Sequence, residues 1–556
     1  MYRSSCCLTF LLLVPTLTFC LALPHRLNRQ GIAQLERSSG RAFSLPIHRR
    51  RKSNNVGRPG RRVGASGSVG IGDNSDLLYT VPIKLGGITT AVNLDTGSSD
   101  LWVISDGCNT DMCKKSTATP YPASSLTSSG TNVTMSYGDS TTGTYASGPI
   151  GMDTATIAGL SVLNQQFAAI DNTTNSAVAF GAAGIFGLGF PSESVIQQSV
   201  VNQQFNDPAT TDQFVASTFQ NGPLLSRIIS SGELLDPMFA INLQRDTIDV
   251  VGSGQLSIGK LPDGVSNSSL TWVPVRLYSD NDGGLSSPAF APNEMYPYRW
   301  EILLEGVYLD GQKLADSTVP GQGVNSTSVS ALIDTGNSLI RGPGDVVQNI
   351  LRTVSPSYAL NVASNAAAQA TVSCSIPHTL GFQIGGQMFP IDPRDFIGAS
   401  NGDTSTCLAD HVVATDAPSK GSLFSWSLGD PFFKSTLVAF YYGNLTHPSV
   451  DPPRIGFLST VPKNASQLLS IAVESAQQNG KFEATTQVAP TASAASASAT
   501  TLSIPSLAMP SGTSAPGRSS PKHTDIQNNS AASICCNGLE RPILVVSLLV
   551  LLSWWI

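Results

Sequence analysis

The sequence has few charged residues and few histidines for its length of 556 residues. Only 13% of the residues are Asp, Glu, Lys or Arg, against about 25% in typical soluble domains. Fewer ionisable groups means fewer carboxylates whose protonation would unfold the chain, so the composition favours an extracellular protein that works in acid. The chain has six histidines, and no Ser-His-Asp arrangement is indicated.

Long apolar runs are missing except at the two ends. Residues 1–22 combine a basic residue, an apolar core and a small-residue cleavage site, the pattern of a secretory signal peptide. The C-terminal run, 542–556, has 15 residues, fewer than the roughly 20 that a membrane-spanning helix needs. It follows small residues and a short polar spacer, which is typical of a GPI-attachment signal. We expect attachment at Asn529 with removal of residues 530–556, and a retained membrane anchor is the alternative.

Acidic residues are almost absent from residues 23–62. This segment has eleven Lys or Arg and a single acid, Glu36, so its net charge is +10. The whole chain carries −6 and Arg3 is also basic, which leaves −17 on the remainder. A basic segment on an acidic body suits an electrostatically docked inhibitory propeptide. The basic runs 49–52 and 61–62 are candidate sites for a kexin-type processing protease, whereas a solvated linker or a nucleic-acid patch are alternatives; secretion argues against nucleic acid.

Two near-copies of one motif carry the chemistry. Residues 94–99 read Leu-Asp-Thr-Gly-Ser-Ser and residues 333–338 read Ile-Asp-Thr-Gly-Asn-Ser. Each copy supplies one carboxylate, Asp95 or Asp334, after an apolar run that predicts a buried strand end. Two carboxylates held about 3 Å apart cannot both ionise cheaply, so one would stay protonated while the other acts as a base on water. The pair therefore predicts acid–base hydrolysis.

The other motif residues have structural reasons. The glycines permit tight turns and close approach of the two loops. The threonine hydroxyls can hydrogen-bond to the opposite loop. Ser98 and Asn337, directly after the glycines, also carry side chains that can form hydrogen bonds. We expect these dyad-supporting residues to be Thr96, Gly97, Ser98, Thr335, Gly336 and Asn337.

At these residues the chain resembles the pepsin family of aspartic proteases, and the similarity covers roughly residues 76–460. Tyr137-Gly138-Asp139 resembles the flap that closes over substrate, and Trp102 matches the family Trp that hydrogen-bonds the flap Tyr. Gly184–Phe190 includes the family's apolar-apolar-Gly segment, and its counterpart is Ser427-Leu428-Gly429, in which Ser427 is a polar departure. The resemblance implies a mainly β, bilobed fold with the active-site cleft between the lobes, and an endopeptidase that is most active in acid.

Two departures from the family pattern concern the site. The second motif has Asn337 where the family usually has Ser or Thr that hydrogen-bonds the outer oxygen of its Asp. An Asn amide can still donate, so we expect a tuned dyad. In the flap, Asp139 could place negative charge over the cleft, although a solvated turn residue is the alternative.

The expected secretory route is oxidising, which favours disulfide bridges among those of the nine cysteines that do not leave with the signal peptide. Two pairs match the spacing of family disulfides, Cys108 with Cys113 and Cys374 with Cys407. Zinc is the alternative for the second pair, because His378 and His411 each lie four residues after one of these cysteines. The secretory signal favours the disulfides, so we expect no metal and no other cofactor.

The expected organisation has six parts. Period-two segments at 78–85, 270–275 and 300–304 predict strands, whereas the Ala/Ser/Thr/Pro-rich stretch after about residue 484 suits a glycosylated stalk. The parts are a signal peptide (1–22), a propeptide (23–62), an N-terminal lobe (63–268), a C-terminal lobe (269–462), a stalk (463–529) and a GPI-attachment signal (530–556).

The leading hypothesis is a monomeric, GPI-anchored, pepsin-like endopeptidase of the cell surface, similar to those of fungi. Its expected partners are protein or peptide substrates, its own propeptide, a processing protease and a membrane lipid, without nucleic acid. An inert pepsin-fold binding protein and a structural cell-wall glycoprotein are the alternatives. Both catalytic motifs and Tyr137 are intact, which favours the enzyme.

Overall fold

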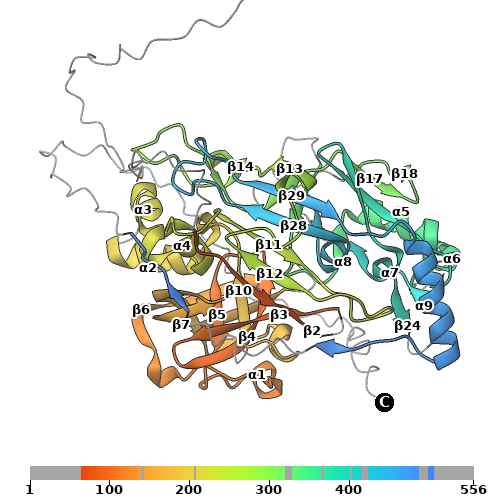
Figure 1. Cartoon of the computed structure of the whole chain (residues 1–556), viewed down its shortest axis with the longest axis horizontal. Helices are drawn as coiled ribbons and strands as arrows, with labels where there is room; N and C mark the ends of the chain where they lie inside the picture. Colours follow the sequence, from red (N-terminus) through yellow and green to blue (C-terminus); the bar gives the residue numbers. More distant parts are fainter. Residues whose placement is uncertain are drawn as a thin grey trace, which may run out of the picture. The chain divides into compact units, whose positions relative to one another are not determined.

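The computed structural model describes residues 64–505, apart from 75, 139–142, 206–207, 320–328, 365–367, 401–402, 415–423 and 488–498. The expected signal peptide, the propeptide, Asp139, Asn529 and the GPI-attachment signal lie outside the described residues. Strands dominate the described part of the chain (Figure 1), so the mainly β fold expected from the sequence is confirmed. No helix within these residues is long and apolar enough to cross a membrane.

Most strands of a mixed sheet come from the first half of the chain, and two short strands come from residues 486–487 and 500–501. Val81 and Ile83 are fully buried in the strand that was expected at residues 78–85. Within the described residues this sheet has eleven strands: β2 (Gly72–Asn74), β3 (Tyr79–Leu85), β4 (Ile88–Asp95), β5 (Leu101–Ile104), β6 (Thr127–Tyr137), β7 (Thr144–Ile157), β8 (Leu160–Ile170), β9 (Asn172–Thr173), β10 (Gly184–Gly187), β30 (Thr486–Gln487) and β31 (Thr500–Thr501).

The second half builds smaller sheets. A five-stranded sheet contains β16 (Glu301–Leu303), β19 (Ser330–Ile333), β27 (Phe424–Leu428), β20 (Ile340–Gly342) and β26 (Val412–Ala414). The others contain β18 (Gln312–Lys313), β17 (Gly306–Leu309), β22 (Leu380–Ile384) and β23 (Gln387–Pro390), then β21 (Thr371–Ser373), β25 (Asp403–Leu408) and β24 (Gly398–Ser400), then β14 (Leu277–Tyr278) and β15 (Tyr296–Pro297).

A six-stranded sheet joins the two halves. Its central pair places Ala240 opposite Ala439, from strands of different halves. The sheet order is β1 (Gly67–Gly70), β12 (Gln255–Ile258), β11 (Met238–Asn242), β28 (Thr436–Tyr441), β29 (Arg454–Ser459) and β13 (Thr271–Pro274).

The longer helices lie around these sheets (Figure 1), whereas all residues of the short helices at 393–396 and 430–435 are buried. The described α-helices are α1 (Asp111–Lys115), α2 (Val195–Phe205), α3 (Thr211–Asn221), α4 (Leu224–Ser230), α5 (Gly344–Val354), α6 (Pro356–Ala363), α7 (Pro393–Phe396), α8 (Asp430–Ser435) and α9 (Ala465–Asn479). Single 3₁₀ turns are η1 (Ala123–Ser125), η2 (Ser176–Val178), η3 (Pro191–Glu193), η4 (Asn267–Ser269) and η5 (Asp280–Asp282).

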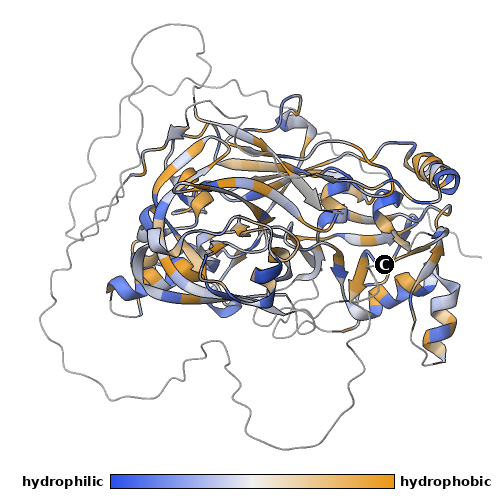
Figure 2. Cartoon of the chain, turned by 90° about the horizontal axis from the view of Figure 1, so that it is seen from below, coloured by the Kyte–Doolittle hydropathy of each residue, from blue (hydrophilic) through white to orange (hydrophobic). Residues whose placement is uncertain are grey.

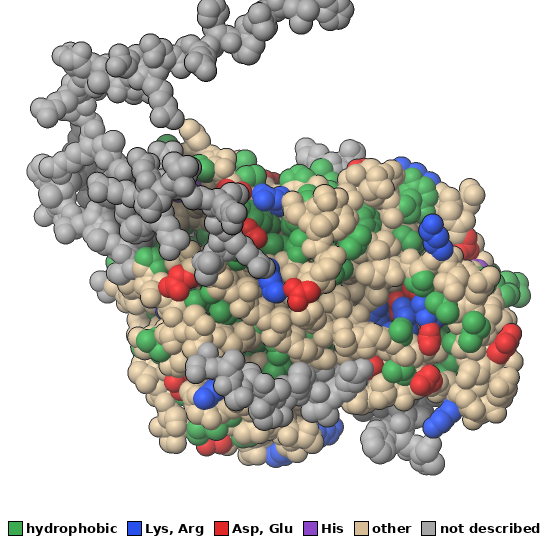
Figure 3. Space-filling view, in the orientation of Figure 1, with side chains coloured by type: hydrophobic (Ala, Val, Ile, Leu, Met, Phe, Trp, Pro, Cys, Tyr) green, Lys and Arg blue, Asp and Glu red, His purple; other side chains and the backbone are tan. Residues whose placement is uncertain are grey.

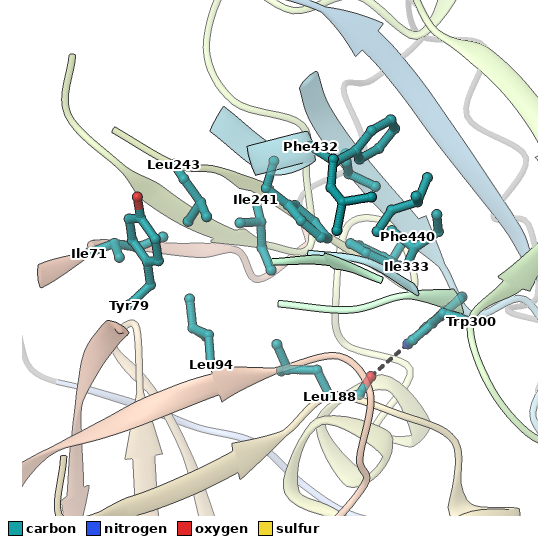
Figure 4. Close-up of a cluster of buried hydrophobic side chains, with 14 of the residues drawn as sticks. Ile71, Tyr79, Leu94, Leu188, Ile241, Leu243, Trp300, Ile333, Phe432 and Phe440 are labelled. Carbon is teal, nitrogen blue, oxygen red and sulfur yellow. Dashed lines mark hydrogen bonds between the residues drawn. The ribbon is translucent and has the colours of Figure 1, made fainter. Parts of the chain in front are cut away.

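One apolar core runs through both halves. It contains Leu94 and Ile333, the residues directly before the two motif aspartates, together with Trp300 (Figure 4). Hydrophobic and hydrophilic residues interchange along the strands that cover it (Figure 2). On the face drawn in Figure 3, charged side chains are scattered among a majority of uncharged residues, as the low charge content requires. The shared core holds the two motif loops at fixed positions.

A buried ionic cluster also joins the halves. Lys434 Nζ lies 3.1 Å from Asp76 and 3.4 Å from Asp395, and Arg245 lies 2.6 Å from Asp395. All four side chains are at most 6% exposed. Removal of one member would leave an uncompensated charge in the interior, so the cluster requires both halves to stay together.

The packed structure continues beyond residue 462, where we expected the stalk to begin. Helix α9 buries Leu469, Val473 and Ala476, whose spacing of four and three residues forms one helical face. Further on, Leu502 is only 3% exposed beside β31, which pairs with β8. Amino-acid composition did not reveal this packing, because a few apolar residues at the right spacing are enough to dock a mostly polar segment.

Candidate active site

The two motif aspartates lie at the ends of equivalent strands of the two halves: Asp95 is the last residue of β4, and Asp334 directly follows β19. In the first half, β4 runs parallel to β10, with Leu94 opposite Phe186. In the second, β19 runs parallel to β27, with Ile333 opposite Leu428. In each half, a buried apolar residue of the strand directly precedes the motif Asp and fixes its position, as the internal repeat in the sequence indicated.

The threonines of the two motifs bind each other's loops. The Thr96 amide donates to Thr335 Oγ1 at 3.1 Å, and the Thr335 amide donates to Thr96 Oγ1 at 3.0 Å. The hydroxyls in turn donate to the opposite strands, Thr96 to the Ile333 carbonyl at 2.7 Å and Thr335 to the Leu94 carbonyl at 3.1 Å. These four hydrogen bonds are buried and reciprocal, so they fix the register of one loop against the other.

The motif glycines allow the carboxyl groups to meet. A Cβ placed on Gly97 would lie 2.4 Å from Asp334 Oδ1, and a Cβ on Gly336 would lie 2.3 Å from Asp95 Oδ1. Both distances are far below van der Waals contact, so any side chain at either position would push the opposite carboxyl away.

The two carboxyl groups lie close together, because a Cβ on Gly336 would lie 2.3 Å from Asp95 Oδ1 and 3.1 Å from Asp334 Oδ1. Burial raises the pKa of Asp95, and burial together with the charge of Asp95 raises the pKa of Asp334 to about 8. Desolvation and like-charge repulsion both disfavour double ionisation. The pair therefore retains at least one proton below about pH 8.

The surroundings of the two aspartates are unequal. Asp95 accepts hydrogen bonds from the Ser98 hydroxyl at 2.5 Å and from the Gly97 amide at 2.8 Å. Asp334 accepts from the Gly336 amide at 2.8 Å, and among the described residues no side-chain hydroxyl or amide donates to it. Donors stabilise the charged form of a carboxyl group, so the negative charge is favoured on Asp95 and the proton on Asp334.

Asn337 does not support Asp334 in the way we expected. Its amide nitrogen donates to Ser427 Oγ at 2.9 Å, and its oxygen accepts from Leu339 at 3.1 Å and Arg341 at 3.0 Å. The two departures from the family pattern in this half, Asn337 and Ser427, are thus hydrogen-bonded to each other. Each polar group satisfies the other inside the fold, and the Asn amide turns away from Asp334.

Tyr137 and Trp102, which the sequence predicts at a flap, lie together. Trp102 Nε1 donates to the Tyr137 hydroxyl at 2.8 Å, and Gly138 takes a left-handed φ of 83° just after the end of β6, a conformation that suits glycine. Burial, followed by the charges of Asp100 and Asp95, holds the pKa of Tyr137 well above its usual range. Tyr137 is therefore close enough to the dyad to respond to its charge.

Sequence reasoning did not single out three ionisable residues beside the dyad. Asp100 is buried and accepts from Ser194 Oγ at 2.5 Å and the Val195 amide at 2.8 Å, and burial raises its pKa to about 6. Glu193 and Arg299 form an ion pair of 2.7 Å. Neither belongs to a repeated motif, and only the fold brings them together.

The four described cysteines form the disulfides Cys108–Cys113 and Cys374–Cys407. The zinc alternative is wrong for these residues, because both sulfur atoms that it required are bonded to each other. The two histidines of that set have other partners: His378 lies 2.8 Å from Asp310, and His411 lies 2.9 Å from the Asp395 carbonyl.

Comparison with known proteins agrees with this geometry. Residues 78–447 match the family model for eukaryotic aspartyl protease. An aspartic protease of Phaffia rhodozyma is 27% identical over 390 residues, which cover 70% of this chain and 77% of that protein. Major aspartyl peptidase 1 of Cryptococcus neoformans var. grubii is 26% identical over 71% of this chain and 72% of its own length. Pepsin A of Bos taurus is 27% identical, covering 64% and 78% respectively.

The chain belongs to the eukaryotic aspartyl protease family. It is a pepsin-like aspartic endopeptidase, related to the fungal and animal enzymes named above.

Proposed function

We propose that Asp95 and Asp334 together activate a water molecule that attacks the scissile peptide bond. The charged member of the pair removes a proton from the water, and the neutral member donates its proton to the carbonyl oxygen. The unequal donors favour Asp95 as the base and Asp334 as the acid. The observation that carries this proposal is the close approach of the two carboxyl groups across the motif loops, together with the raised pKa values of both.

Asp95→Asn and Asp334→Asn test the pair. Each variant removes one acid–base group at almost constant volume, so cleavage of a peptide substrate at pH 4 should fall by at least about a thousandfold while the melting temperature stays near the wild-type value. Asp263→Asn, at an exposed carboxyl group, is the matched control. Substantial cleavage by either dyad variant would contradict the proposal.

Tyr137, held by Trp102, is proposed to position the substrate beneath the flap together with Gly138 and Asp139. Ser98 and the loop residues Thr96, Gly97, Thr335 and Gly336 are proposed to hold the dyad in place. The basis is the set of hydrogen bonds described above. Tyr137→Ala should reduce turnover far less than loss of either Asp, since the flap carries no proton in the chemistry.

The cellular setting is also proposed. The signal peptide and the disulfides support secretion. The basic segment 23–62 would inhibit the acidic enzyme until a kexin-type protease cuts after Arg62, and the C-terminal signal would place the product on the cell surface through a GPI lipid at Asn529. Phosphatidylinositol-specific phospholipase C should then release active enzyme from cells. Recovery of residues 546–556 in mature protein would contradict the anchor.

A further inference from the structure

Arg227 is a buried cation that has no acidic partner within the described residues. It is 4% exposed, and it donates at 2.9 to 3.1 Å to four neutral oxygen atoms, namely Gln165 Oε1 and the carbonyls of Leu163, Asn164 and Phe219. Burial lowers the pKa of Arg227 to about 10, and no neighbouring carboxylate offsets this effect. The guanidinium group therefore stays charged in acid, and its charge is uncompensated inside the fold.

A break in the regularity of β8 explains these contacts. The register between β7 and β8 shifts between Asp153 and Ala155, and Asn164 has a left-handed φ of 52°. The carbonyls of Leu163 and Asn164 consequently both reach Arg227. A guanidinium group has five N–H donors, and the contacts above use the Nε hydrogen, both on Nη1 and one on Nη2. The second Nη2 hydrogen has no acceptor in the described part of the chain.

Arg227 lines a cavity whose volume is about 940 Å³, within the range of about 300–1,000 Å³ that is usual for small-molecule sites. Its walls come from β6, β7 and β8, from α2, α3 and α4, and from residues 501–504. Residues 500–501 form β31, the blue strand at the left of Figure 1, which pairs with the start of β8. Among the described lining residues, Arg227 is the only charged one, and none belongs to the dyad, its supporting loops or the expected flap.

Two further lining side chains are buried and keep unused polar atoms. Gln166 is 5% exposed, and its Oε1 accepts from the Ser129 hydroxyl at 2.6 Å. Asn221 is 6% exposed, and its Nδ2 donates to Gln204 Oε1 at 3.1 Å. Gln166 Nε2 and Asn221 Oδ1 have no hydrogen-bond partner among the residues that the structure describes. One donor and one acceptor at a cavity wall suit ligand hydroxyl groups, which both donate and accept.

We propose that this cavity binds a small hydroxylated anion, a sugar phosphate or a sugar carboxylate, with its anionic group on Arg227. The ligand would supply the counterion that the fold lacks, through a charge-assisted hydrogen bond to the remaining Nη2 hydrogen. Gln166 and Asn221 would bind its hydroxyl groups. Because no dyad or flap residue lines the cavity, this site is separate from the proposed cleavage of peptides.

The C-terminal segment closes one side of the cavity. Leu502 is 3% exposed, and the Ser503 amide donates to Glu233 Oε1 at 2.7 Å, so the segment is held at two successive residues. A ligand in the cavity would contact both this segment and the body of the first half. Ending the chain after Gln487 removes that wall and should weaken binding.

The test is calorimetric titration of the purified protein at pH 5 and low ionic strength, where charge attraction is least screened. The four probes are glucose 6-phosphate, glucuronate, inorganic phosphate and glucose. At least one of the two anionic sugars should bind about tenfold or more tightly than glucose, as expected for a hydrogen bond to a charged group. The tighter of the two identifies the anionic group. Inorganic phosphate, which lacks the sugar hydroxyls, should bind more weakly than that sugar.

Two variants test the residues. Gln166→Glu puts a carboxylate on the cavity wall, leaves the carbonyl contacts of Arg227 in place and should weaken binding of the anionic sugar by about tenfold or more. Gln387→Glu, on the exposed start of β23, adds the same charge elsewhere and should bind like the wild type. Arg227→Met should lose the preference for the anionic sugar over glucose. If it does not fold, as its melting curve will show, Gln166→Glu decides alone.

Four outcomes would overturn the inference. The first is no saturable binding of either anionic sugar at millimolar concentration. The second is glucose or inorganic phosphate binding as tightly as both of them. The third is wild-type affinity in Gln166→Glu. The fourth is loss of binding in Asp95→Asn, which would place the ligand at the dyad.

Discussion

Asn337→Ser should shift the pH range of activity towards acid. The substitution places a hydroxyl where Ser98 stands in the first motif, and Ser98 donates to the outer oxygen of Asp95 at 2.5 Å. In the wild type, the Asn337 amide donates to Ser427 instead. A new donor to Asp334 would stabilise its ionised form and lower its pKa, so the dyad would lose its single proton at lower pH.

The expected shift follows from one hydrogen bond. A hydrogen bond to a charged group contributes roughly 1.5–3 kcal/mol, and each pKa unit corresponds to about 1.4 kcal/mol. Partial solvent access to Asp334 favours the lower end of that range, which predicts a shift of about one pH unit in the upper limb of the kcat profile. The assay is steady-state cleavage of one peptide from pH 3 to 8.

Two further variants separate this effect from a disturbed loop. Asn337→Ala removes the amide without supplying a donor, so its upper limb should stay within about 0.2 units of the wild type on the scale set by hydrogen-bond energies. Asn337→Ser combined with Ser427→Ala removes the vacated partner and should keep the shift. The reasoning is refuted if Asn337→Ala shifts the limb as far as Asn337→Ser, or if the serine variant melts like the wild type and shows no shift.

Three other predictions concern stability. The raised pKa of Asp100, about 6 against an ordinary 3.8, means that its contribution to stability is fully present below pH 4 and is lost as pH rises through 6. Urea titrations over this pH range should show that the free energy of unfolding falls by about 3 kcal/mol less in Asp100→Asn than in the wild type. An equal fall in both proteins would contradict the raised pKa. Lys434→Met leaves Asp76 and Asp395 without their shared cation and should destabilise the folded protein by about 3–5 kcal/mol. As a control, Lys260→Met at the exposed pair with Asp263 should cost at most about 1 kcal/mol. Equal melting temperatures of the two variants would show that the buried cluster is not needed for stability. Ending the chain after Pro505 should preserve the melting temperature and activity. Ending it after Gln487 removes buried Leu502 and should lower the stability of the folded protein by about 2 kcal/mol. Identical stability of the two truncated proteins would show that β31 does not dock in solution.

The sequence predicted the parts of this molecule that repeat. Asp95 and Asp334 were identifiable because one motif occurs twice, and the apolar residues before each Asp indicated the buried strand ends that the structure contains. The cysteine pairs were predictable from family spacing and the secretory signal. Glu193 and Arg299 were not predictable, because isolated charged residues 106 positions apart carry no local pattern.

The end of the packed structure was mislocated for a different reason. A stalk is recognised by composition, but docking depends on a few side chains. Leu469, Val473 and Ala476 place one apolar face on α9 within a mostly polar segment, and Leu502 does the same for β31. An average over many residues dilutes such a signal, whereas a search for helical spacing would have found the face of α9.

Asn337 and Ser427 show what an internal repeat adds to this reasoning. Compared with the first half of the repeat, each of these two residues is a separate polar substitution, and either one alone would suggest a weakened site. In the register of β19 beside β27, Leu332 lies opposite Ser427. Asn337 follows Leu332 by five residues, and the motif loop turns back so that Asn337 reaches Ser427. The two substitutions therefore satisfy one buried hydrogen-bonding requirement between them. Because that requirement is met away from Asp334, the second half keeps its packing while its carboxyl group lacks the donor that Ser98 supplies to Asp95. The asymmetry of the two motifs thus follows from a paired change in the supporting strands, with both motif aspartates left in place.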